Sequence, residues 1–170
     1  MDNFPPTCIL TARLDESSQI FFDEMRSRYF PKDRNLLSAH LTLFHKLPDT
    51  EGTIQVLSGI FSQPFHLWVN ALKNIGNGVA YFIDSPELLQ LHRYLQQQFS
   101  PHLSLQDQQG IRPHITIQNK VKPEEARELL NLLQPNFRPF EATVNGLDLW
   151  RYLDGPWEHQ QYFSFDESAS

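Results

Sequence analysis

The sequence predicts a single α+β domain made of two similar lobes, and three features of its pattern support this fold class. Short runs of alternating apolar and polar residues indicate strands, and apolar residues at helical spacing indicate helices between them. The order of these elements recurs once, over approximately residues 36–84 and 110–165. A length of 170 residues fits one domain spanning residues 1–170.

The first half of the chain begins with an apolar run bounded by prolines, which indicates a buried strand. Asp15 is placed to cap the helix that follows, and Ser85-Pro86-Glu87 opens a later helix with proline in its first turn. The expected order is strand 7–14, helix 15–30, strand 39–47, a helix near 54–61, strands 65–72 and 79–84, and helix 86–99.

The second half repeats this order after a polar loop. We expect a strand at 113–121, a helix at 123–133 and strands at 140–151 and 160–165. The repeat extends to single residues, because the run HLTL at 40–43 corresponds to HITI at 114–117. One such unit has a one-sided sheet that needs a partner. We therefore expect two lobes that pack with their motif strands facing each other.

Composition narrows the class of partner. The formal net charge of −6 argues against binding long nucleic acid, which requires clustered Lys and Arg. Cys8 is the only cysteine, so an internal disulfide or a cysteine-rich metal site is excluded. The opening MDNFPPTCILTARL lacks a basic, then apolar, leader pattern, and no run is long enough to span a membrane. We expect a cytoplasmic monomer with no membrane partner.

The two repeated motifs place polar side chains on one face of each strand. Side chains alternate along a strand, so His40, Thr42, Phe44 and Lys46 are predicted to share a face. By the same rule His114 and Thr116 share the matching face of the second strand, with Gln118 and Lys120 beyond them. Two such strands facing a cleft would surround an anion with two imidazoles and two hydroxyls.

This arrangement suits in-line displacement at phosphorus. The reaction needs a base on the attacking oxygen and an acid on the leaving oxygen, and histidine serves either role near neutral pH. The hydroxyls of Thr42 and Thr116 can donate hydrogen bonds to the non-bridging oxygens, where negative charge accumulates. The alternative is a duplication that preserved both motifs for structural reasons alone.

These two motifs resemble those of the two-histidine (2H) phosphoesterase superfamily, in particular its branch of bacterial 2′–5′ RNA ligases and RNA 2′,3′-cyclic phosphodiesterases. The resemblance covers nearly the whole chain. It implies a bilobal α+β fold with antiparallel sheets facing a central cleft, helices outside, and metal-free hydrolysis of a 2′,3′-cyclic phosphate. For the matching positions of this chain, the resemblance implies that His40 protonates the leaving 3′-oxygen and that His114 activates water. It implies that Thr42 and Thr116 hold the phosphate.

The chain departs from the usual pattern just after each motif, where it runs Phe44-His45-Lys46 and Gln118-Asn119-Lys120. Lys46 and Lys120 could balance phosphate charge or be solvated, and Phe44 could stack on a base or belong to the core. Arg112 lines the cleft or faces solvent, whereas His45 is expected to point away from His40 and to be structural. No cofactor or metal site is predicted, because the other histidines lack ligand spacing.

The sequence therefore predicts a metal-independent cyclic phosphodiesterase, similar to 2′–5′ RNA ligases, acting on a small nucleotide or an RNA terminus. Two alternatives stay open. One keeps the chemistry but takes an ADP-ribose-derived cyclic phosphate, and the other is a non-catalytic module that binds terminal phosphates. A nucleotide-activated ligase is disfavoured, because the sequence has no glycine-rich ATP-binding loop.

Overall fold

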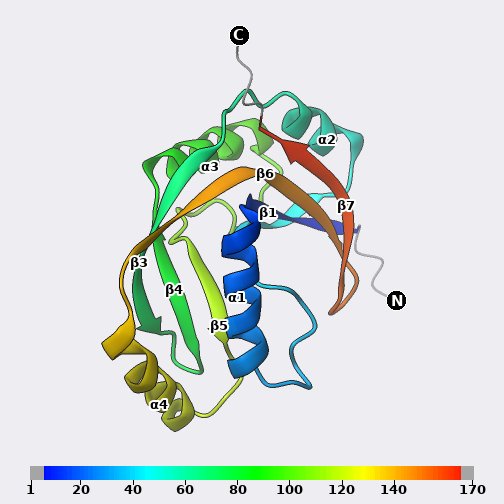
Figure 1. Ribbon diagram of the computed structural model, residues 1–170. Helices are drawn as coiled ribbons and strands as arrows, with labels where there is room; N and C mark the ends of the chain where they lie inside the picture. Colours follow the sequence, from blue (N-terminus) through cyan, green and yellow to red (C-terminus); the bar gives the residue numbers. More distant parts are fainter. Residues whose placement is uncertain (1–5, 166–170) are drawn as a thin grey trace.

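The computed structural model describes residues 6–165, so the leader expectation falls partly outside the described residues (Figure 1). Each predicted element is present, in the predicted order. The strands are β1 (Thr7–Leu14), β2 (Thr42–Pro48), β3 (Phe65–Asn74), β4 (Val79–Asp84), β5 (His114–Gln118), β6 (Phe140–Tyr152) and β7 (Trp157–Ser164). The helices are α1 (Glu16–Tyr29), α2 (Glu51–Ser58), α3 (Pro86–Phe99) and α4 (Pro123–Leu133), and a 3-10 turn, η1, covers Gln134–Asn136.

All seven strands belong to one antiparallel sheet, in the order β2-β1-β6-β3-β4-β5, with β7 also paired to β6. The prediction of two separate sheets is therefore wrong. The strands form one sheet because β6, with 13 residues, is long enough to pair with strands of both halves. Val144 of β6 pairs with Leu14 on one side and with Phe65 on the other, so β6 joins both halves of the sheet (Figure 1).

The predicted repeat has a counterpart in the order of elements, since β2-α2-β3-β4 is followed later by β5-α4-β6-β7. The two motif strands pair outside their own units, β2 with β1 and β5 with β4. They are the two end strands of the path through the sheet. That the two units superpose stays a prediction.

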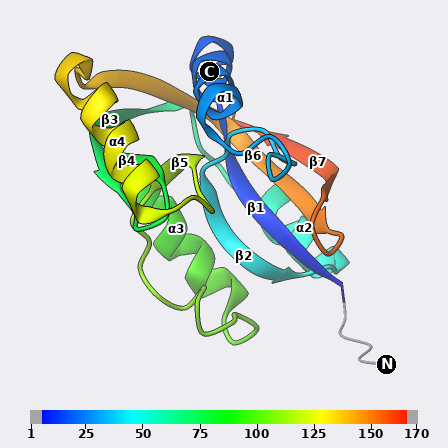
Figure 2. The same ribbon diagram turned by 90° about the horizontal axis from the view of Figure 1, so that it is seen from below.

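The helices begin where the sequence indicated. The Asp15 carboxylate accepts a hydrogen bond from the Ser18 backbone N–H (3.1 Å), and the Ser85 hydroxyl accepts one from Leu88 (3.2 Å). Figure 2 places α1 and α3 on opposite faces of the sheet. Phe22 of α1 and Leu95 of α3 are completely buried in the apolar core. Within residues 6–165, no helix is long and apolar enough to cross a membrane.

Candidate active site

His40 and His114 stand at equivalent places with equivalent backbone contacts. His114 is the first residue of β5, and His40 lies two residues before the start of β2. Each ring donates a hydrogen bond from Nδ1 to the carbonyl oxygen two residues earlier, which belongs to Ser38 or to Arg112, at 2.8 Å in both cases. A carbonyl only accepts hydrogen bonds, so the proton of each neutral ring is on Nδ1. Each Nε2 is therefore left as an acceptor.

Both histidines line one cavity of about 330 Å³. Thr42, Thr116 and Arg112 also line it, so five of the eight predicted site residues converge there. The remaining wall comes from His45 and from the loop before β5, through Gln106, Asp107, Gln109, Gly110 and Ile111. The cavity thus lies between the two end strands of the sheet. The catalytic roles of these residues stay predictions.

Phe44 is not available to a substrate, and its predicted binding role is wrong. Leu10 of β1 pairs with Phe44, whereas Thr11 pairs with Thr42, so β2 contains a bulge with one extra residue. The bulge ends the alternation of faces, and Leu43 and Phe44 are both completely buried. The Phe44 ring stacks on His92, with ring centroids 4.7 Å apart. Phe44 is therefore a core residue.

Lys46 and Lys120 are not among the residues that line the cavity. Both lie beyond a bulge, since β5 has the same irregularity: Ala80 pairs with Thr116, whereas Val79 pairs with Gln118. The strand then ends at Gln118, and Lys120 lies in a turn with a left-handed backbone (φ 62°). Both lysine side chains are exposed, and their predicted role in binding phosphate stays a prediction.

His45 is the site residue that sequence reasoning missed, because the bulge in β2 turns it into the cavity. The carboxylate of Asp107 accepts hydrogen bonds from the backbone N–H groups of His45 (2.9 Å) and Lys46 (2.8 Å), and it lies 3.4 Å from His45 Nδ1. Burial alone would raise the pKa of Asp107, but these hydrogen bonds lower it below its usual value. The alternation of apolar and polar residues along β2 cannot predict this contact, because Asp107 belongs to a distant loop.

His40 differs from His114 in its surroundings. The pKa of His40 is lowered to about 4, mainly by burial and also by the positive charge of Arg26, although the hydrogen bond to Ser38 acts in the opposite direction. The indole of Trp157 covers the ring, with ring centroids 4.6 Å apart. His114 is exposed and stacks on Phe82 (5.3 Å). In the free protein near neutral pH, His40 is therefore uncharged.

Arg26 of α1 connects the two motif regions. Its side chain is buried, and Nε donates to the Asn35 side-chain oxygen (2.8 Å) and to the carbonyl of Leu37 (3.0 Å). Its Nη1 donates to the carbonyl of Thr116 in β5 (3.2 Å). One guanidinium thus holds the loop before His40 and the strand of His114 together. No sequence pattern marks Arg26 as a buried link, because an arginine in a helix is usually solvated.

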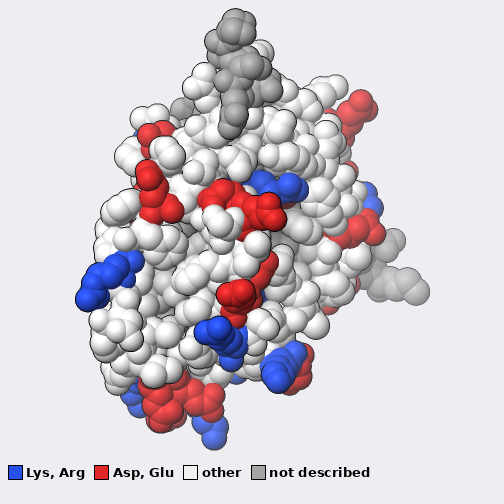
Figure 3. All heavy atoms as spheres, in the orientation of Figure 1, with Lys and Arg blue, Asp and Glu red and all other residues white. Residues whose placement is uncertain are grey.

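Charged side chains are interspersed on the face seen in Figure 3, where Lys and Arg form separate spots among Asp and Glu. Among residues 6–165, no group of three or more His, Cys, Asp or Glu side chains is placed to hold a metal ion.

Comparison with protein families gives a match to most of the chain. The sequence model of the 2′-5′ RNA ligase superfamily matches residues 14–156, a range that contains both motifs. The chain belongs to the 2′-5′ RNA ligase superfamily. Membership confirms the resemblance that the motifs indicated. No curated protein sequence matches the chain.

Solved structures of similar fold include TT0787 of Thermus thermophilus, with a TM-score of 0.66 and 16% identity, covering 94% of this chain and 97% of that one. E. coli LigT complexed with 3′-AMP has a TM-score of 0.62 and 17% identity, covering 96% and 100%. E. coli LigT complexed with phosphate has a TM-score of 0.60 and 17% identity, with the same coverage. At these identities the likeness establishes the α+β fold of this 2′-5′ RNA ligase superfamily member.

Proposed function

We propose that the protein is a phosphodiesterase that hydrolyses a 2′,3′-cyclic phosphate or a 2′–5′ phosphodiester of a small RNA or nucleotide, without a metal ion. One observation carries the proposal. Two histidines with acceptor Nε2 atoms and two threonines, from opposite ends of the sheet, line the same cavity of about 330 Å³. The two halves of the sheet would act as two lobes, each presenting one motif to the substrate.

The reaction on a 2′,3′-cyclic phosphate follows from these groups. Nε2 of His114 takes a proton from water while the water oxygen bonds to phosphorus. The bond from phosphorus to O3′ breaks, and O3′ takes a proton from Nε2 of His40. The Thr42 and Thr116 hydroxyls donate hydrogen bonds to the non-bridging oxygens as their charge increases. The product is a 2′-phosphate with a free 3′-hydroxyl.

His40 must carry a proton to act as the acid, although it is neutral in the free protein at neutral pH, where its pKa is about 4. A phosphate anion bound beside the ring favours the charged form and raises this pKa. We infer that His40 takes up its proton together with the substrate.

Similar proteins support a nucleotide substrate. E. coli LigT has been crystallised in complex with 3′-AMP, with ATP and with NADP+. The net charge of −6 also favours a small substrate over long nucleic acid.

A substrate screen tests the proposal. The purified protein is incubated with 2′,3′-cyclic nucleotides, 2′–5′ dinucleotides and an ADP-ribose-derived cyclic phosphate, with EDTA present. We expect turnover of a cyclic nucleotide or a 2′–5′ dinucleotide, with a 2′-phosphate product from the cyclic substrate. Turnover of the ADP-ribose compound alone would change the substrate class. A rise in Tm with these compounds but no turnover would indicate a binding module and contradict the proposal.

A further inference from the structure

The imidazole of His45 lines the cavity of about 330 Å³ together with those of His40 and His114. Its side chain is 46% exposed, so a small molecule can reach it. After burial, which is the main cause, charge on His45 is among the factors that lower the pKa of His40, so the two rings lie within electrostatic range of each other. In the mechanism above, His40 and His114 move the protons, and His45 has no role.

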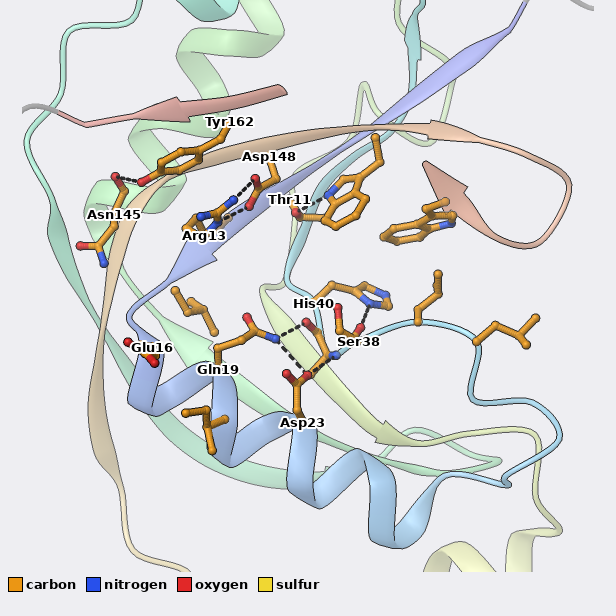
Figure 4. A pocket seen from close by; sticks show the side chains of 18 residues that line it. Thr11, Arg13, Glu16, Gln19, Asp23, Ser38, His40, Asn145, Asp148 and Tyr162 are labelled. Atoms are coloured by element: carbon orange, nitrogen blue, oxygen red, sulfur yellow. Dashed lines mark hydrogen bonds and ion pairs between the residues drawn. The ribbon is translucent and has the colours of Figure 1, made fainter. Parts of the chain in front are cut away.

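All three rings are held in the same way, with an oxygen acceptor at Nδ1. Nδ1 of His40 donates to a backbone carbonyl (Figure 4), and Nδ1 of His114 does the same, at 2.8 Å in both cases. For His45 the acceptor is the carboxylate of Asp107, whose Oδ1 lies 3.4 Å from Nδ1. Among residues 6–165, no hydrogen bond engages Nε2 of His45, so this atom is available to a ligand.

The carboxylate of Asp107 fixes the orientation of this ring. Its side chain is 1% exposed, and its oxygens also accept the hydrogen bonds from the backbone N–H groups of His45 and Lys46. These bonds tie the carboxylate to the bulge in β2, beside the ring. An ionised carboxylate only accepts hydrogen bonds, so it favours a proton on Nδ1 of His45.

The cavity has few permanent positive charges for a bound anion. Among its lining residues, all within 6–165, Arg112 is the only Lys or Arg, and it is exposed. A protonated imidazole at position 45 can donate from both nitrogens, from Nδ1 to Asp107 and from Nε2 to a phosphate oxygen. Such charge-assisted hydrogen bonds are shorter and stronger than neutral ones.

We propose that His45 is a third phosphate-binding imidazole, whose Nε2 donates a hydrogen bond to a non-bridging oxygen of the substrate while Asp107 positions the ring. The inference rests on the proposed function and adds a binding residue to it. His40 and His114 keep their roles, and His45 transfers no proton. Because the phosphate is an anion before and during the reaction, the contact acts on substrate affinity rather than on kcat.

His45→Ala tests the contact, with 2′,3′-cyclic AMP as substrate and inorganic phosphate as competitive inhibitor. One hydrogen bond to a charged group is worth at least about tenfold in affinity, so KM and the inhibition constant should each rise by this factor, while kcat changes less than about threefold. His45→Phe keeps a ring without a donor and should lose the same affinity, which guards against misfolding of His45→Ala. His45→Gln keeps a neutral donor and should recover part of it.

His66→Ala is the matched control. Nδ1 of His66 also lies 3.4 Å from a carboxylate, that of Glu141, but His66 belongs to β3 and does not line the cavity. This variant should change neither constant. An unchanged phosphate inhibition constant in His45→Ala and His45→Phe would overturn the proposal. A large fall in kcat with unchanged KM would also overturn it, because His45 would then act in proton transfer.

The positioning role of Asp107 is tested by a double-mutant cycle. Asp107→Asn keeps an oxygen acceptor for the backbone of β2 but removes the negative charge beside the ring. It should raise the phosphate inhibition constant about threefold or more when His45 is present, and not in the His45→Ala background. Equal effects in both backgrounds would refute this role.

Calorimetric titration with inorganic phosphate separates the contact from the chemistry, because it needs no turnover. Phosphate binding that weakens at least about tenfold in His45→Ala, without turnover of any substrate by the wild type, would refute the proposed function and leave the contact standing. Turnover by the wild type with equal phosphate affinity in both proteins would refute the contact alone.

Discussion

His40 and His114 share a motif and a backbone contact, yet they differ in everything around them. His40 is covered by Trp157 and lies near the charge of Arg26, whereas His114 is exposed against Phe82. The sequence predicted both residues and their pairing from the repeat. The sequence does not show which histidine is the acid and which is the base. Trp157 and Arg26, which make the surroundings of His40 different, are distant in the chain, and no local pattern relates them to His40.

Removing either imidazole should nearly abolish catalysis. A general acid or base typically contributes about 10²–10⁴ in rate, so we expect His40→Ala and His114→Ala each to lower kcat at least about a hundredfold. The double variant should lose less than the product of the two, because the proposed mechanism makes the two residues act as a unit. Circular dichroism should show an intact fold. Near-normal turnover by either variant would leave a duplicated structural motif as the better explanation.

The low pKa of His40 should make the fold less stable in acid. The folded-state value of about 4 lies below the unfolded value of about 6.5, so the unfolded chain binds more protons between these pH values. The free energy of unfolding should therefore fall as pH decreases from about 6.5 towards 4, and this histidine should contribute no pH dependence above that window. Urea midpoints measured from pH 4 to 8 should decline less for His40→Gln than for the wild type. If the urea midpoints of the variant and the wild type fell equally with decreasing pH, the lowered pKa of His40 would be contradicted.

At the scale of single elements, the bulges in β2 and β5 decide which residues reach the cavity. Alternation correctly separated His40 and Thr42 from the buried Leu41 and Leu43, but it failed from Phe44 onwards. A bulge depends on register with the neighbouring strand and on partners for the displaced N–H groups. In β2 the buried carboxylate of Asp107, 61 residues from Lys46, supplies those partners. Sequence pattern within the strand could not predict it.

Asp107 should therefore stabilise the fold through the bulge. Asp107→Ala removes the acceptor for the backbone N–H groups of His45 and Lys46, and we expect a loss of about 1–3 kcal/mol in the free energy of unfolding. Chemical denaturation measures this loss. Asp33→Ala is the control, because its side chain is 83% exposed, and it should change stability by less than about 0.5 kcal/mol. An Asp107→Ala variant as stable as the control would exclude this role.

At the scale of the whole molecule, one sheet brings its two end strands to a common cavity. The sequence predicted the α+β class and the recurring order of elements, and it placed the motifs on opposite sides of a site. It could not distinguish one sheet from two, because that depends on β6 pairing with β1 and β3 at once. It also could not identify Arg26 of α1 as the side chain that links the two motif regions across this arrangement.

The link through Arg26 should matter for catalysis beyond its contribution to stability. Arg26→Met leaves the carbonyls of Leu37 and Thr116 without this donor, so the two motifs are held less closely. A displacement of about 1 Å in a catalytic group can cost about a hundredfold in rate, and we expect kcat to fall by up to this factor. Loss of the positive charge should also raise the pKa of His40, which an NMR titration of the imidazole measures.

Arg26→Lys separates the two effects, because lysine keeps the charge but lacks the planar guanidinium that reaches three acceptors. Its His40 pKa should stay near the wild-type value, while kcat should still fall. A purely structural role for Arg26 would lower stability in both variants without raising the His40 pKa in Arg26→Met, and that result would refute the electrostatic part. Wild-type kcat in a folded Arg26→Met variant would refute the positional part, since the motifs would then keep their places without the guanidinium.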